Sequence, residues 1–141
     1  MVKKTEGGDG LSSMYRKTKN TVSYIRYVFV FCPSRKRKIF DIPEVSQRFE
    51  EKAEDVCKRD LDTKITDLRF GENYVRMTVC CPPWLSPQAF MRKVKYETSR
   101  YLRSIFPELS HRKSLWTKSY FVTTNSIVTE DTLEEYVSMQ K

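Results

Sequence analysis

The sequence predicts an α+β protein in which an antiparallel sheet carries two helices on one face. Runs of aromatic and β-branched residues closed by glycine or proline indicate strands, and stretches with apolar residues at helical spacing lie between them. The length of 141 residues suits one domain, which we expect over residues 14–141. Residues 1–13 are rich in glycine and serine and are expected to form a flexible tail.

The first half of the chain predicts a strand, a helix and a pair of strands. Residues 22–31 (VSYIRYVFVF) are aromatic and β-branched, as is typical of a strand. Pro43 opens a stretch with helical spacing of apolar residues. Strands are then predicted over 64–70 and 74–81, on either side of a turn at 71–73.

The second half predicts a helix, a strand and a final helix. Ser86 is a predicted N-cap followed by Pro87, and this helix should end near Phe106. Residues 115–124 predict a strand, and Thr129 caps a helix with acidic residues in its first turn. The order β-α-β-β-α-β is that of ferredoxin-like or RRM-like folds, here with an extra C-terminal helix.

Composition excludes several classes of protein. Hydrophobic residues make up 39% of the chain and aromatic residues 13%, which argues against disorder. No apolar run reaches the roughly 18 residues of a membrane span, and a signal peptide is not recognisable, so we expect a cytoplasmic protein with no membrane partner. The only histidine, His111, excludes a site built on paired histidines. The cysteines lack disulfide-framework or zinc spacing and are predicted to be reduced core thiols: Cys32, Cys57, Cys80 and Cys81.

The net charge of +8 is concentrated in two basic clusters. One is the loop after the first strand, with Arg35, Lys36, Arg37 and Lys38. The other lies along the second predicted helix, with Arg92, Lys93, Lys95, Arg100 and Arg103. Such clusters with aromatic neighbours suit a phosphate backbone and unpaired bases, so these residues are candidate DNA contacts. The alternative is a solvated helix face beside a soluble loop.

Four segments resemble, in order and spacing, the small single-tyrosine transposases of insertion sequences, the transposase-A group of the HUH nucleases. They are YVFVFCPSRKRKIF at 27–40, ENYVRMTVCCPPWLSPQAFMRKVK at 72–95, SIFPEL with LWTKSYFV, and EEYVSMQ at 134–140. The resemblance implies a homodimer that binds single-stranded DNA hairpins and uses a tyrosine for strand cleavage and joining in DNA transposition. It further implies a divalent metal, Mg²⁺ or Mn²⁺, held by two histidines and a glutamine.

Carried onto this chain, the resemblance makes Tyr136 the nucleophile and Gln140 the third metal ligand. Their spacing of four places both on one helical face. The alternative is that Leu133, Tyr136 and Val137 form an ordinary packing stripe.

The histidine pair of the family is replaced here by Tyr74–Val75–Arg76. A phenol is a poor metal ligand and a guanidinium repels a divalent ion, so metal binding is doubtful and we expect impaired cleavage. Arg76 is then either a clamp on the scissile phosphate or part of a dead site. The alternative function is a non-catalytic DNA- or RNA-binding module, with Tyr27, Phe29 and Tyr74 as base-stacking surfaces if they face outward.

Overall fold

The computed structural model describes residues 15–111, 114–125 and 127–140, so the predicted tail at 1–13 lies outside the described residues. Within these residues the main sheet is antiparallel with the order β4-β5-β3-β6. Its strands are β3 (Ile25–Phe31), β4 (Lys64–Phe70), β5 (Val75–Cys81) and β6 (Phe121–Thr123). The helices are α1 (Val45–Asp60), α2 (Pro87–Ile105) and α3 (Glu130–Ser138). A short ribbon, β1 (Arg16–Lys17) with β2 (Val22–Ser23), and the 3-10 turns Ser34–Lys36, Ile39–Asp41 and Pro107–Leu109 complete them.

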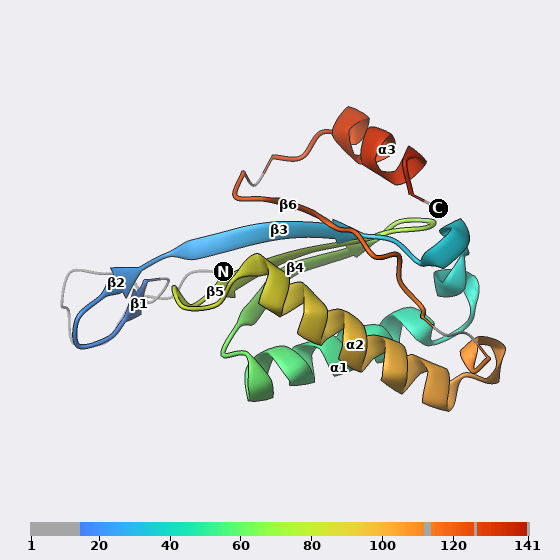
Figure 1. Cartoon of the computed structure of the whole chain (residues 1–141), viewed down its shortest axis with the longest axis horizontal. Coiled ribbons are helices and arrows are strands. Elements are labelled where there is room, and N and C mark those ends of the chain that lie inside the picture. The colour runs from blue at the N-terminus through green and yellow to red at the C-terminus, as the bar shows by residue number, and fades with distance from the viewer. Residues whose placement is uncertain (1–14, 112–113, 126, 141) are drawn as a thin grey trace.

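Helices α1 and α2 pack against one face of the sheet, and α3 lies over the other face (Figure 1). The core between the sheet and the first two helices is aromatic, and Phe29, Phe49 and Phe90 are fully buried in it. The rings of Phe29 and Phe90 stack with centroids 4.9 Å apart. The predicted α+β class and the β-α-β-β-α-β order with a C-terminal helix are therefore confirmed.

The face of the sheet that looks toward α3 is also apolar at its centre. Strand alternation turns Val28 and Val30 away from Phe29, and both are nevertheless buried. Leu133 is the buried residue of α3. This helix therefore belongs to the packed structure and extends the fold beyond a two-layer sandwich.

Local signals in the sequence place both caps correctly. The Ser86 hydroxyl accepts a hydrogen bond from the Ala89 amide at 3.0 Å, and the Thr129 hydroxyl accepts one from Thr132 at 3.2 Å. The first helix begins at Val45 rather than at Pro43, because Glu44 has a φ of 71° and a left-handed residue cannot continue a right-handed helix.

The strand predicted over 115–124 is shorter than expected. Only Phe121–Thr123 pairs with β3. Trp116 forms an isolated antiparallel bridge with Pro33, and pairing with β3 does not begin until Phe121. The carbonyls of Thr117 and Ser119 accept hydrogen bonds from Lys95, so they are directed at α2 instead of a neighbouring strand.

Two further predictions concern the cysteines and the membrane. All four cysteines are free thiols, and Cys32, Cys57 and Cys81 are buried as predicted. Cys80 is only half-buried, so its assignment to the core was wrong. Burial raises the pKa of the Cys57 thiol to about 11.

Across the described part of the chain, no helix combines the length and the apolar character that a membrane span needs.

Candidate functional site

Tyr136 and Gln140 meet the segment that precedes β6. The Ser119 hydroxyl donates to Gln140 Oε1 at 2.6 Å, and its oxygen lies 3.0 Å from the Tyr136 hydroxyl. Because the single Ser119 proton is used toward Gln140, the Tyr136 hydroxyl is the donor to Ser119. The Thr117 hydroxyl also donates to Gln140 Oε1, at 3.3 Å. These four residues are called the Tyr136 cluster below.

Two lysines hold the backbone around this cluster. Lys95 Nζ donates to the carbonyls of Thr117 and Ser119 at 2.8 and 2.7 Å. Lys36 Nζ donates to the Ser138 carbonyl at 3.2 Å, at the C-terminal end of α3, where the helix dipole favours a cation. Each of the two predicted basic clusters thus contributes one lysine to an intramolecular contact beside Tyr136.

Burial changes the ionisation of the groups in and around the cluster. Desolvation raises the pKa of the Tyr136 phenol, and the hydrogen bond with Ser119 offsets part of that effect. Desolvation also lowers the pKa of Lys95 to about 8. At neutral pH the phenol is therefore protonated, and a phenol is a much weaker nucleophile than a phenolate.

Arg76 lies on the same face of the sheet as Tyr136. In the strand register, Arg76 pairs with Val30 and Val30 pairs with Phe121, so the three side chains share one row and one face. The Phe121 ring lies 6.0 Å from the Tyr136 ring, centroid to centroid. The predicted nucleophile is thus positioned over the row that contains Arg76.

Tyr74 lies just before β5, in the turn that joins β4 to β5. Its half-buried ring lies against Gly71, where any Cβ atom would overlap the ring. A larger residue at position 71 would therefore displace the Tyr74 ring from this place at the edge of the sheet.

Residues 21–140 match the family model described as "Transposase IS200 like". The chain belongs to the IS200-like transposase family.

Solved structures share the fold of this IS200-like transposase. A protein of Deinococcus radiodurans R1 that is assigned as a transposase has a TM-score of 0.79 at 22% identity, over 89% of this chain and 97% of that one. A REP-associated tyrosine transposase, bound to a REP hairpin, has a TM-score of 0.54 at 13% identity, over 86% of this chain and 68% of that one. No curated protein sequence matches the chain.

The remaining predicted DNA contacts of this transposase fall into two groups. Some cations already have acidic or backbone partners: Lys38 with Glu72, Lys93 with Asp60 and Glu97, and Arg103 with the Ser99 carbonyl. The others are exposed: Arg35, Arg37, Arg92 and Arg100. Arg35 and Lys36 are consecutive left-handed residues, with φ of 59° and 55°, so this loop holds a costly backbone conformation.

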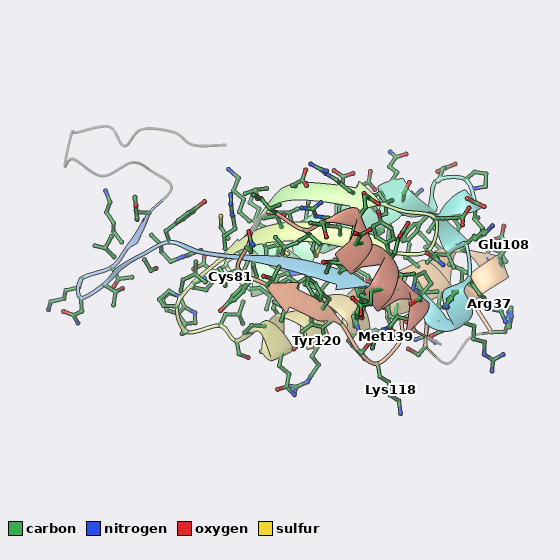
Figure 2. All side chains as sticks on the ribbon, turned by 90° about the horizontal axis from the view of Figure 1, so that it is seen from above. Arg37, Cys81, Glu108, Lys118, Tyr120 and Met139 are labelled. Atoms are coloured by element: carbon green, nitrogen blue, oxygen red, sulfur yellow. The ribbon has the colours of Figure 1, made fainter. Side chains whose placement is uncertain are left out.

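Sequence patterns missed a groove between α2 and residues 114–118, which is called the α2 groove below. It has a volume of about 380 Å³, and the residues that matter here are Arg92, Lys95, Tyr96, Arg103, Trp116 and Lys118. Lys118 points away from the molecule in the view from the α3 side (Figure 2). The groove was hidden from sequence analysis because residues 115–120 were expected to form a regular strand. The one signal for this groove in the sequence was Tyr96, an aromatic residue that lies among the predicted helical cations. In the structure Tyr96 is exposed.

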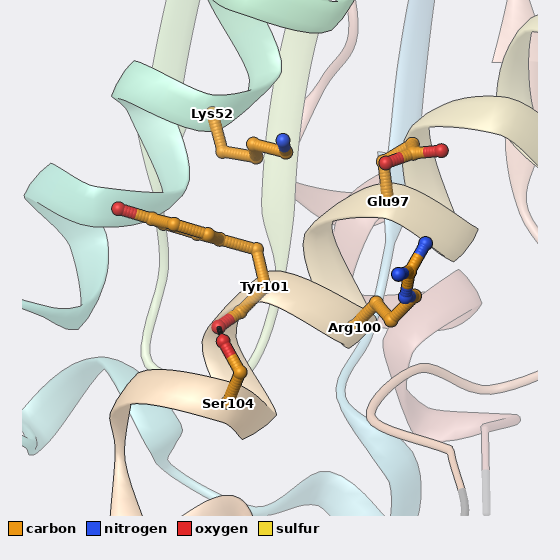
Figure 3. A pocket seen from close by; sticks show the side chains of 5 residues that line it. All are labelled: Lys52, Glu97, Arg100, Tyr101 and Ser104. Carbon is orange, nitrogen blue, oxygen red and sulfur yellow. Dashed lines mark hydrogen bonds between the residues drawn. The ribbon is translucent and has the colours of Figure 1, made fainter.

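A second cavity lies between α1 and α2 and is shown in Figure 3. Lys52 of α1 faces the Tyr101 ring, with its Nζ 5.4 Å from the ring centroid. Glu97 and Arg100 contribute charges of both signs, and the Tyr101 hydroxyl accepts a hydrogen bond from Arg48. This mixed charge does not favour a phosphate.

The donor chemistry beside Tyr136 does not fit a divalent metal ion. Gln140 Oε1, the predicted ligand atom, already accepts two hydrogen bonds in the Tyr136 cluster. Arg76, in the cross-strand row with Val30 and Phe121, carries a positive charge that repels a metal cation. In the described ranges, no three His, Cys, Asp or Glu side chains gather as a metal site would require. His111 is exposed and follows the 3-10 turn Pro107–Leu109.

Proposed function

We propose that this IS200-like transposase binds hairpins of single-stranded DNA as a homodimer, and that tyrosine-based strand cleavage and joining is impaired. The observation that carries the proposal is the arrangement of Tyr136 and Gln140 in a closed hydrogen-bonded cluster above a row that contains Arg76 instead of a metal-ligating histidine. The hairpin-bound REP-associated transposase, which has the same fold, supports the choice of ligand.

The distribution of exposed cations supports DNA as the ligand. Arg35 and Arg37 lie in the loop after β3, and Arg92 lies on α2. Guanidinium groups bind phosphates through paired N–H donors and release counterions on binding. Lys36 and Lys95 stabilise the chain itself, so we assign the main electrostatic contribution to the exposed arginines.

The state of Tyr136 supports impaired cleavage. Attack on a phosphodiester would form a bond from the Tyr136 oxygen to phosphorus, would release the 3′ oxygen of the neighbouring nucleotide, and would require loss of the phenol proton. That proton is directed at Ser119, an alcohol that does not accept it permanently at neutral pH. The raised pKa of Tyr136 makes the loss harder still.

Arg76 is assigned to bind the phosphate rather than to replace the metal in full. A guanidinium stabilises negative charge on phosphate oxygens, and Arg76 lies in the same cross-strand row as Phe121, whose ring contacts Tyr136. It provides no open coordination position for a nucleophile or a leaving group. Arg76 therefore supports binding, while cleavage remains weak.

A non-catalytic DNA- or RNA-binding module that stacks bases on its sheet is less well supported. In that alternative, Tyr27, Phe29 and Tyr74 would stack on bases from an exposed sheet, whereas the Tyr74 ring is half-buried against Gly71. Phe29 is fully buried against α2, and Tyr27 packs against the same core, so the idea of Phe29 as a stacking surface is wrong. The other face of β3 is buried on the side of α3.

Binding is tested with a hairpin oligonucleotide and a scrambled strand of the same composition. We expect tighter binding to the hairpin and a steep loss of affinity with salt, because phosphate contacts release counterions. Arg37→Ala should reduce the salt slope by about one phosphate contact. Lys58→Ala removes the same charge from the exposed face of α1 and should leave the slope unchanged. Equal affinity for both strands would refute hairpin recognition.

The proposed homodimer is tested separately, by measuring the mass of the free protein in sedimentation.

Cleavage is tested by denaturing electrophoresis after incubation with the hairpin and Mg²⁺ or Mn²⁺. The native chain should give little covalent adduct, and Tyr136→Phe should give none. The double variant Tyr74→His with Arg76→His restores the family's histidine pair and should increase the adduct in a metal-dependent manner. Abundant adduct from the native chain would contradict the proposed impairment.

A further inference from the structure

Lys95 connects α2 to the segment that holds Tyr136. Its Nζ donates to the carbonyls of Thr117 and Ser119 at 2.8 and 2.7 Å. The hydroxyls of these same two residues reach the Tyr136 side: Ser119 contacts Tyr136 and Gln140, and Thr117 donates to Gln140. One ammonium group therefore fixes the backbone of both residues whose hydroxyls contact the Tyr136–Gln140 pair.

The segment around Ser119 lies outside the strand ladder. Pairing with β3 begins at Phe121, and Trp116 forms an isolated bridge on the other side of the segment. Residues 118–120 span the distance between these two points, and the Ser119 carbonyl accepts its hydrogen bond from Lys95 instead of from a neighbouring strand. The position of the Ser119 hydroxyl therefore depends on Lys95.

The ammonium of Lys95 lies among aromatic rings. Its Nζ is 5.9 Å from the centroid of the Phe31 ring and 5.7 Å from that of Tyr120. Taking a charge out of water is costly unless hydrogen bonds compensate, and here the two carbonyls do so. Lys95 is therefore directed into the protein, and its hydrogen bonds hold the segment that carries Ser119.

We propose that Lys95 is a positioning residue for strand cleavage by Tyr136, acting through the backbone and the hydroxyl of Ser119. This inference rests on the proposed function and gives Lys95 a role other than the contact with DNA that its charge suggests. It holds the Tyr136 side chain against Phe121, in whose cross-strand row Arg76 lies. Placement of this kind controls rate, since a displacement of about 1 Å costs about 100-fold.

The first experiment observes Tyr136 without DNA, by NMR of the full chain with isotope-labelled tyrosine Cζ atoms. The Tyr136 signal is the one that Tyr136→Phe removes. Ser119→Ala should shift this signal, because the phenol loses its hydrogen-bond partner. Lys95→Met should shift it in the same direction, while Lys95→Arg, which keeps the charge and the donors, should stay near the native position. Lys58→Met is the matched control on the exposed face of α1 and should have no effect.

A double variant separates positioning from general stabilisation. If Lys95 acts through Ser119, Lys95→Met should add no further shift in a Ser119→Ala chain, because the contact it supports is already gone. A purely stabilising role predicts a lower urea midpoint with the Tyr136 signal at its native position. That result, or shifts that add in the double variant, would overturn the proposal. Lys95→Gln, which keeps a donor, replaces Lys95→Met if the latter does not fold.

The second experiment measures covalent adduct with a hairpin and Mn²⁺ in the Tyr74→His, Arg76→His chain. Lys95→Met should lower the rate at saturating hairpin by about 10- to 100-fold. The hairpin concentration that gives half the maximal rate should stay the same, because Lys95 does not contact the strand. Lys95→Arg should recover most of the rate. An unchanged maximal rate with a higher half-saturating concentration would show that Lys95 binds DNA, and the positioning role would be wrong.

The positioning role and the proposed function fail in different ways. Because the first experiment contains no DNA, it decides the role of Lys95 even if hairpins are not preferred over scrambled strands. A native Tyr136 signal in Lys95→Met, together with tight hairpin binding, would refute the positioning role and leave the proposed function standing.

Discussion

The hydroxyl of Ser119 is expected to control how firmly α3 is held on the sheet. Ser119→Ala removes the contacts to Tyr136 at 3.0 Å and to Gln140 at 2.6 Å. Each hydrogen bond contributes about 0.5–1.5 kcal/mol net, and Ser119 is exposed, so we expect a loss of about 1–2 kcal/mol. Leu133 is the one buried side chain among the described residues of α3, so the loss is large relative to what holds the helix.

Native-state hydrogen exchange measures this loss directly. Amide protection in α3 should fall by about 5- to 30-fold in Ser119→Ala, while the amides of β3 and β5 keep theirs. Ser104→Ala is the matched control, since its hydroxyl donates to the Tyr101 carbonyl at 2.6 Å on the far side of the sheet. Unchanged protection in α3, or an equal fall in all strands, would refute the assignment of Ser119 as one of the contacts that hold the helix.

Three other substitutions test the packing and the ionisation of the chain. Phe90→Ala should lower the free energy of unfolding in urea by about 3–5 kcal/mol, because it removes the ring stacked on Phe29. Leu133→Ala should increase exchange throughout α3 by more than Met139→Ala, whose side chain is 70% exposed. The pKa of Lys95 is about 8 in the folded chain against 10.5 for an ordinary lysine, so the unfolded state binds more protons between these values. The native chain should therefore gain stability over Lys95→Met as pH rises from about 8 to about 10, and a constant difference in urea midpoints would contradict the burial of Lys95.

Local patterns in the sequence predicted the elements and their caps because those features depend on neighbouring residues. Ser86 and Thr129 cap helices through contacts three residues away. The prediction that Tyr136 and Gln140 share one helical face holds only for Tyr136, because α3 ends at Ser138 and Gln140 follows it. Charge patterns could not distinguish a lysine available to bind DNA from a lysine that hydrogen-bonds within the chain. Lys95 has the sequence context of a surface cation, yet it donates to carbonyls more than twenty residues later in the chain.

The hydrogen-bond partners of Tyr136 and Gln140 also could not be predicted from the sequence. Ser119 and Thr117 reach Gln140 only because residues 115–120 leave the strand geometry expected for them. That departure is accompanied by the long-range contacts of Lys95 with the Thr117 and Ser119 carbonyls, which no period-two pattern encodes. The row of side chains from Arg76 through Val30 to Phe121 could be predicted only with the strand order, in which β3 lies between β5 and β6.

The buried pair Val28 and Val30 has a consequence for solubility. Both lie on the face of the sheet toward α3, so a chain with α3 displaced would expose an apolar strip at the middle of a sheet. Such strips drive self-association of soluble proteins. Any state in which α3 leaves its place must therefore supply another apolar cover, and exchange of α3 between two copies of the chain meets that requirement without aggregation.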